Sequence, residues 1–135
     1  MPPRRQPVSA PLPTGAELDI LNVLWKLGPS TVRDVHEAMG KSSGYTTTLK
    51  QMQLMTEKGL LVRSERFRSH VYEAGIPREQ TQRQIARDLL VRAFDGSARN
   101  LVLGALSAQP ASEEEIADIR RLLDEFTPAR KRGKP

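Results

Sequence analysis

A short run of hydroxyl, amide and ammonium side chains stands at helical spacing in the first half of the chain, formed by Thr46, Thr47, Lys50 and Gln51. At 100° per residue these side chains point away from the side shared by Tyr45, Leu49, Met52 and Met55, so the expected helix has one polar and one apolar side. Hydroxyls and amides can donate and accept hydrogen bonds, and an ammonium group can meet a guanine edge or a phosphate. The polar side therefore suits the edges of a DNA duplex, although an ordinary solvated helix surface would look the same.

A second source of positive charge follows this helix. Residues 60–66 and 69–74 partly alternate between polar and apolar side chains, which predicts two antiparallel strands about Phe67-Arg68, although the tip lacks the Asn-Gly or Asp-Gly of a tight hairpin. The hairpin arginines can reach phosphates or a minor groove, and two serines before the helix can anchor a phosphate at its positive end. Solvated charges are the plainer interpretation of the arginines. The predicted DNA-binding residues are Ser42, Ser43, Tyr45, Thr46, Thr47, Lys50, Gln51, Arg63, Arg66 and Arg68.

Local signals predict the first helix of the framework that positions these groups. Thr14-Gly15-Ala16-Glu17 is a capping box, in which the threonine oxygen and the glutamate side chain each satisfy a free backbone N–H group. Gly28-Pro29 ends the helix, because glycine tolerates positive φ and proline cannot continue the hydrogen bonds. The expected buried stripe consists of Leu18, Leu21, Val23, Leu24, Trp25 and Leu27.

Two more helices precede the hairpin. Ser30 or Thr31 begins a short one that ends at Gly40, and its expected inward residues are Val32, Val35, Ala38 and Met39. The polar helix then runs from about Tyr45 to Lys58 and stops at Gly59. Three helices followed by a hairpin with arginines near its tip is the order of a winged helix-turn-helix.

The second half of the chain predicts three amphipathic helices. The first spans residues 78–95, the second surrounds Leu101, and the last begins at Ser112. Ser112 to Glu115 repeat the spacing of a capping box, and the acids Glu113 to Glu115 suit the positive end of the helix dipole. Helices of this length behind a small domain cannot bury all their apolar faces within one chain, so a dimerisation domain is expected. Its predicted contact residues are Ile85, Leu89, Phe94, Leu101, Leu106, Ile119, Leu122, Leu123 and Phe126.

These signals predict a mainly α fold with a small β-hairpin and four parts: a disordered arm over 1–13, a winged helix domain over 14–75, a helical dimerisation domain over 76–127 and a basic tail over 128–135. The net charge of +5 is unevenly spread. Residues 1–74 hold ten Lys and Arg against seven Asp and Glu, residues 75–127 hold seven against nine, and the tail adds four positive charges. A basic first half suits a polyanion, whereas the acidic middle suits protein contacts.

Several classes of protein are disfavoured. The absence of cysteine excludes disulfides, thiolate catalysis and thiolate metal sites. No apolar run is long enough to cross a bilayer or to act as a secretory signal, which predicts a cytoplasmic protein without membrane insertion. The two histidines, His36 and His70, have no second ligand at metal spacing and no serine-acid pair, so neither an enzyme, nor a metal site, nor a cofactor is expected. Trp25, on the apolar stripe of the first helix, is expected in the core.

Five segments resemble the penicillinase repressor family, which includes the penicillinase and methicillin-resistance repressors and their copper-responsive relatives. They are residues 18–28 (LDILNVLWKLG), 31–35 (TVRDV), 45–49 (YTTTL), 58–61 (KGLL) and Arg68 with Tyr72. The resemblance implies a bacterial winged-helix repressor that binds a palindromic operator in double-stranded DNA as a homodimer. It also implies that residues 45–58 form the recognition helix and that the hairpin is the wing.

The chain departs from the family pattern in ways that bear on function. Leu54 stands where the family usually has an arginine, so the operator sequence can differ from that of other members. Phe67 stands where a glycine is common before the wing arginine, so the shape of the wing can differ as well. The cysteine cluster of the copper-responsive relatives is missing, so copper sensing by that route is excluded. Antibiotic-responsive members are cleaved by a membrane-bound sensor metalloprotease after an asparagine, and Asn100-Leu101 lies at about the matching place. An asparagine between two helical segments, with no protease involved, is the competing interpretation.

The sequence thus predicts a homodimeric transcriptional repressor, with release by proteolysis in the dimerisation domain as one route of induction. Two alternatives stay open: a protein-interaction adaptor whose winged domain has lost DNA contact, and a regulator gated by a small ligand.

Overall fold

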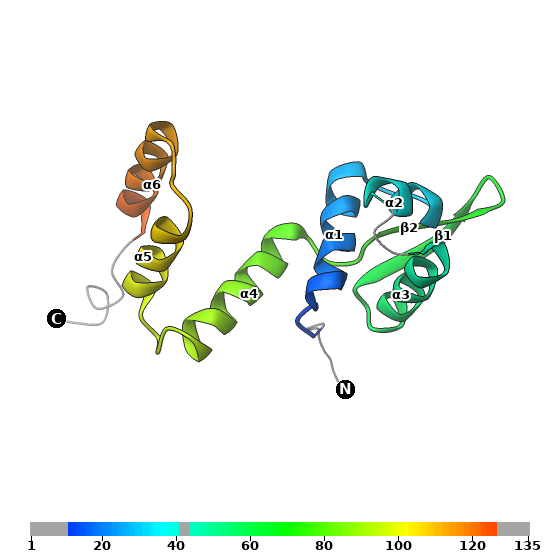
Figure 1. Ribbon diagram of the computed structural model, residues 1–135, viewed down its shortest axis with the longest axis horizontal. Helices are drawn as coiled ribbons and strands as arrows, with labels where there is room; N and C mark the ends of the chain where they lie inside the picture. Colours follow the sequence, from blue (N-terminus) through cyan, green and yellow to red (C-terminus); the bar gives the residue numbers. More distant parts are fainter. Residues whose placement is uncertain (1–10, 41–43, 127–135) are drawn as a thin grey trace. The chain divides into compact units, whose positions relative to one another are not determined.

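The computed structural model describes residues 11–40 and 44–126, which form six helices and one antiparallel hairpin (Figure 1). The elements in chain order are α1 (Gly15–Leu27), α2 (Val32–Ala38), α3 (Tyr45–Glu57), β1 (Leu61–Arg66), β2 (Ser69–Ala74), α4 (Arg78–Arg92), α5 (Ala98–Ala108) and α6 (Glu113–Glu125). Contacts divide the chain into two compact units, one ending at Arg87 and the other starting at Asp88. The predicted arm, apart from residues 11–13, and the predicted tail lie outside the described residues.

Side-chain caps fix where the first two helices begin. The Thr14 hydroxyl accepts from the Glu17 N–H at 3.2 Å, and the Glu17 carboxylate accepts from the Thr14 N–H at 2.9 Å. Thr31 and Asp34 form the same reciprocal pair before α2. Each pair satisfies two N–H groups that have no partner within the helix, so both start points are determined within four residues of sequence.

The hairpin pairs Leu61 with Ala74 at its base and Arg66 with Ser69 at its tip. Its two-residue turn, Phe67-Arg68, has positive φ at both positions, 51° and 64°, as in a type I′ turn. A two-residue hairpin therefore forms without the glycine that such turns favour. The connection between α1 and α2 pairs with β2 through a single antiparallel β-bridge. In this bridge Ser30 and Tyr72 exchange two backbone hydrogen bonds of 2.9 and 2.8 Å.

One hydrophobic core joins α1, α2, α3 and the hairpin. Its buried apolar residues are Ile20, Leu21, Leu24, Val32, Val35, Met52, Met55, Leu60, Leu61 and Tyr72. The expected stripe of α1 was partly wrong: Ile20 is buried, whereas Leu27 is exposed. The buried positions of α1 begin at Glu17, follow i, i+3, i+4, i+7 spacing and end at Leu24. Leu27 is the last residue of the helix and lies beyond this packed section. Ala38, at the end of α2, is exposed for the same reason.

The first turns of α4 belong to the winged unit. The Trp25 indole N–H donates to the Ile76 carbonyl at 3.0 Å, and the Arg78 guanidinium lies 5.9 Å from the centre of the Trp25 ring. Thr81 is buried, and within the described residues its hydroxyl has no hydrogen-bond partner. Trp25 is thus half-buried at the edge of the core, and the division of the chain falls inside α4 at Arg87, later than the boundary expected at residue 76.

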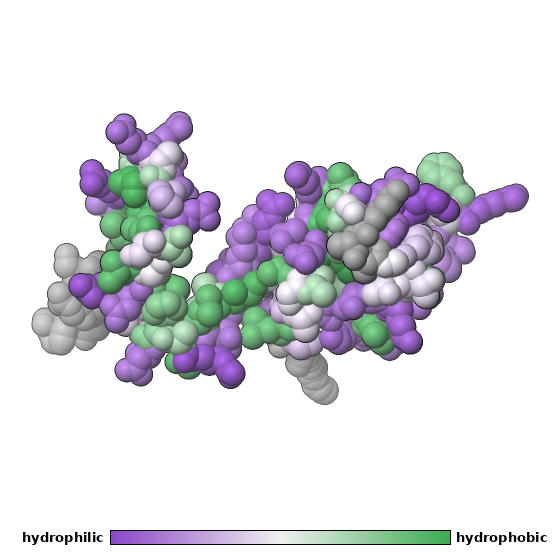
Figure 2. Space-filling model, in the orientation of Figure 1, coloured by the Kyte–Doolittle hydropathy of each residue, from purple (hydrophilic) through white to green (hydrophobic). Residues whose placement is uncertain are grey.

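The second unit contains the end of α4 with α5 and α6, and it buries little apolar surface. Ser97 and Ser112 cap α5 and α6 through their hydroxyls, accepting from the Asn100 and Glu115 N–H groups at 3.0 Å each. No residue of α5 or α6 is buried, and Figure 2 shows hydrophobic surface on these helices. None of the described helices is long and apolar enough to cross a membrane.

Candidate nucleic-acid interface

The outward side of α3 carries the polar groups that the sequence predicted there. Thr46, Thr47 and Lys50 are exposed, while Gln51 is half-buried on the flank toward the core. Leu54 is exposed on the same helix, so this side is not wholly polar. Ser42 and Ser43 lie outside the described residues, and the N-cap of α3 is Gly44, which makes no side-chain cap.

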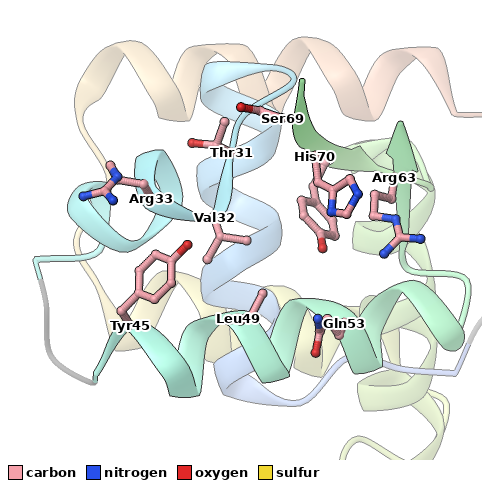
Figure 3. Close-up of a pocket in the computed structure, with 10 residues that line it drawn as sticks. Thr31, Val32, Arg33, Tyr45, Leu49, Gln53, Arg63, Ser69 and His70 are labelled. Atoms are coloured by element: carbon pink, nitrogen blue, oxygen red, sulfur yellow. The ribbon is translucent and has the colours of Figure 1, made fainter. Parts of the chain in front are cut away.

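A hollow of about 340 Å³ opens beside this helix, between α2, α3 and the hairpin (Figure 3). Figure 3 shows Arg33 and Tyr45 on one side and Arg63 with His70 on the other, above the ribbon of α3. The remaining lining residues are Thr31, Val32, Leu49, Gln53, Ser69 and Tyr72. Gln53 lines the hollow, is exposed and follows Lys50 by three residues on the same side of α3. The hollow therefore borders the exposed side that carries Thr46 and Lys50.

Three side chains fix the start of α3 against α2. The Arg33 guanidinium lies 6.0 Å from the centre of the Tyr45 ring, and the His36 ring meets that ring edge-on at 5.8 Å. His36 Nδ1 also lies 3.4 Å from the hydroxyl of the buried Thr48. These contacts turn Tyr45 toward the hollow and leave it partly exposed, although the sequence pattern placed it on the apolar side of α3.

The far end of α3 is fixed by an ion pair. Lys58, the C-cap of α3, places its ammonium 2.5 Å from the buried carboxylate of Glu17 in α1. The chain then turns at Gly59, where φ is 88°. Both ends of the helix are thus tied to other elements of the winged unit, which holds its polar side in a fixed direction.

The hairpin adds an exposed cationic edge formed by Arg63, Arg66 and Arg68. Opposite charge is scarce there: Glu65 is the one acid of β1, and its carboxylate lies 3.5 Å from His70 Nε2 across the hairpin. Within the described residues, none of these arginines forms an ion pair, and the same holds for Arg33 and Lys50. Cations without local partners are available to an external polyanion.

A family model described as penicillinase repressor matches residues 13–125. The chain belongs to the penicillinase repressor family. Membership agrees with the motifs on α1 and α3 and with the cationic hairpin. The family consists of transcriptional repressors, so this member is a regulator and not an enzyme. Its fold is a winged helix-turn-helix followed by further helices.

Relatives include the penicillinase repressor of Bacillus licheniformis, 27% identical over 112 residues, which are 82% of this chain and 88% of the relative. The transcriptional regulator BlaI of Mycobacterium tuberculosis is 30% identical over 113 residues, 82% of this chain and 81% of the relative. A solved homodimeric winged helix-turn-helix DNA-binding domain from Mycobacterium bovis is 25% identical and covers 59% of this chain and 69% of its own, with a TM-score of 0.45.

The residues predicted for dimerisation in this family member all lie on the helices from α4 onward, except Phe94 and Phe126, which follow α4 and α6 directly. None of the nine is buried. The most exposed are Phe126 at 73% and Leu123 at 65%. Phe94 is half-buried beside α5, where a Cβ atom added at Gly104 would lie 3.4 Å from its ring.

The predicted cleavage position lies inside a helix. Asn100 is exposed on the first turn of α5, its N–H donates to the Ser97 hydroxyl, and its side chain accepts from Arg99 at 3.0 Å. The Leu101 N–H donates to the Ser97 carbonyl at 3.1 Å. The peptide bond between Asn100 and Leu101 is therefore part of a capped helical turn and does not lie in an open connection.

The sequence pattern missed five polar residues that line the hollow: Thr31, Arg33, Gln53, Ser69 and His70. Gln53 follows Lys50 by three residues and is exposed, so helical spacing alone could have included it. Arg33 lies on α2, Thr31 is its N-cap, and Ser69 and His70 lie on the hairpin. No local signal connects these four residues with α3.

Proposed function

We propose that this chain binds double-stranded DNA as a homodimer and represses transcription from a palindromic operator. The observation that carries the proposal is the continuity of three cationic or polar surfaces within the winged unit. The exposed side of α3, the hollow between Arg33 and Arg63, and the arginine edge of the hairpin adjoin one another.

Each part matches a different feature of a duplex. A helix of 13 residues is about 20 Å long and fits a major groove about 12 Å wide, so α3 can present Thr46, Thr47 and Lys50 to base edges. Arg33 and Arg63 then face the phosphates that border the groove, while Arg66 and Arg68 face the adjacent backbone or minor groove. Base contacts supply specificity, and phosphate contacts supply most of the affinity.

Exposed apolar surface in the second unit supports the homodimer. Leu122, Leu123 and Phe126 together leave a hydrophobic strip on and just after α6 without cover from the described chain. A second copy is the occupant that a palindromic operator requires, because two-fold symmetry then relates two α3 helices to two half-sites about 34 Å apart. In this proposal the winged unit contacts DNA through α3 and the hairpin, and α5 and α6 join the copies, with α4 as the connection.

The direct test is binding of the full chain to a duplex taken from upstream of its own gene. Fluorescence anisotropy should show nanomolar to tens-of-nanomolar affinity, and affinity should fall steeply between about 50 and 200 mM salt because counterions are released. A scrambled duplex of equal length is the control. Equal affinity for both duplexes, or no binding at low salt, would contradict the proposal. Absence of DNA binding together with a co-purifying protein partner would favour the adaptor alternative.

We further propose that release follows cleavage between Asn100 and Leu101 by a membrane-bound sensor metalloprotease. Exposure of Asn100 supports this route, although the first turn of α5 must open before a protease can hold the bond in extended form. Mass spectrometry of the protein from induced cells should find a fragment ending at Asn100. Operator release with the chain still intact would exclude this route.

A further inference from the structure

Phe67, at the tip of the hairpin, is 98% exposed, more than any other large hydrophobic residue among those described. The other aromatic rings of the winged unit are at least partly packed: Tyr72 is buried, Trp25 half-buried, and Tyr45 in contact with Arg33 and His36. In Figure 2, hydrophobic surface stands beside hydrophilic surface at the end of the β1–β2 hairpin. An isolated apolar ring at this position contributes nothing to the core of the winged unit.

The backbone at Phe67 also argues against a role in folding. Its φ of 51° lies in the left-handed region, which glycine, asparagine and aspartate enter readily and bulky residues do not. Arg68 is in the same region, at 64°. Phenylalanine therefore stabilises the hairpin through neither burial nor backbone preference, and the reason for it lies outside the folded chain.

The surroundings of Phe67 identify the chemistry of its partner. Arg66 and Arg68 flank it directly, and Arg63 lies three positions before Arg66 on the same hairpin. The acid of β1, Glu65, already has His70 opposite it. An apolar ring between unpaired guanidinium groups matches a stack of bases bordered by two rows of phosphates.

We propose that Phe67 is a wedge that enters the minor groove next to the segment read by α3, opens one base step and bends the duplex. Arg66 and Arg68 bind the phosphates on either side. This inference rests on the proposed DNA binding and adds a mode of sequence recognition to it. Because pyrimidine–purine steps such as TA and CA unstack most easily, the operator should carry one at the wing position of each half-site.

Two substitutions separate this role from a structural one. Phe67→Gly removes the ring and suits the positive φ, so the melting temperature should stay equal or rise. Phe67→Leu keeps an apolar wedge. Val62→Ala is the matched control, since Val62 is a half-exposed apolar residue at the base of the same hairpin.

The readouts are affinity by anisotropy, duplex bending by energy transfer between end labels, and unstacking by 2-aminopurine at the wing-proximal step. For the full chain, Phe67→Gly should weaken operator binding by about tenfold, as expected for loss of one base–aromatic contact, and should abolish bending and the 2-aminopurine signal. Phe67→Leu should retain most of both, and Val62→Ala should match the wild type.

The outcomes distinguish this inference from the proposed function. Wild-type binding and bending that persist unchanged in Phe67→Gly would overturn the wedge and leave the repressor intact. Wild-type protein that binds no duplex would overturn both. Binding of the wild type to phosphatidylglycerol vesicles that is lost in Phe67→Gly, with DNA affinity unchanged, would assign the ring to a lipid surface instead.

Discussion

The ammonium of Lys58 lies 2.5 Å from the carboxylate of Glu17, two residues that are 41 positions apart in the sequence. The other carboxylate oxygen of Glu17 accepts from the Thr14 N–H. Burial by itself raises the pKa of Glu17, but the hydrogen bonds with Lys58 and Thr14 outweigh it, and the pKa lies below its ordinary value. One buried charge therefore begins α1 and fixes the end of α3, the helix that we assign to the major groove.

This pair predicts a pH-dependent stability. Because the folded pKa of Glu17 is lowered, its contribution is present above the ordinary glutamate value of 4.5 and is lost as the pH falls below it through the folded pKa. Glu17→Gln should lower the free energy of unfolding at pH 7 by about 1 to 3 kcal/mol, since charged hydrogen bonds are lost. Urea denaturation at pH 7 and at pH 3 measures this, and the deficit should shrink at the lower pH.

Glu57→Gln is the control, because it makes the same charge change at an exposed position of α3. It should leave the stability at both values of pH nearly unchanged. Equal effects of the two substitutions would mean that the general charge balance, and not the buried pair, sets the stability.

Lys50 is expected to contact a base edge. Lys50→Ala should weaken operator binding by about 1 to 3 kcal/mol and reduce the preference for the operator over a scrambled duplex. Lys26→Ala removes the same charge from the last turn of α1 and serves as the control. If both variants lose affinity equally for both duplexes, Lys50 contributes only to the nonspecific electrostatic attraction between the protein and DNA.

Arg33 lines the hollow beside Tyr45 and is expected to bind a DNA phosphate there. Arg33→Ala should weaken binding to all duplexes alike, and the slope of log affinity against log salt should become shallower by about one unit. A parallel titration of Arg33→Lys separates charge from shape, because lysine restores the charge without the planar group over the Tyr45 ring. An unchanged slope in the alanine variant would remove Arg33 from the interface.

The strip on α6 is expected to hold the homodimer together. Leu122→Glu or Leu123→Glu should give monomers in sedimentation equilibrium, because a charge would be buried between the copies. Ala117→Glu places the same charge on the opposite side of α6 and should leave the dimer intact. A tight dimer in all three variants would place the contact surface elsewhere.

Local chemistry made much of the fold predictable. The starts of α1, α2 and α6 follow from Thr14, Thr31 and Ser112, because each cap is a hydrogen bond that spans three residues. At Ser112, the Glu115 N–H donates to the hydroxyl, but no reciprocal bond from the Glu115 carboxylate is among those of the described residues. The polar side of α3 and the limits of the hairpin were likewise encoded by spacing along the chain.

The tertiary structure decided what spacing could not. Arg33, Tyr45 and Arg63 meet around one hollow only because α2, α3 and the hairpin share a core. Lys58 reaches Glu17 only because α1 and α3 pack in that same core. The positive φ of Phe67 follows from closing the hairpin in two residues, against the preference of the residue itself. The sequence by itself determined which elements form and which sides of them are polar. The packing determined which side chains line the candidate DNA interface together, because contacts between residues distant in the sequence depend on the whole core and not on any local pattern.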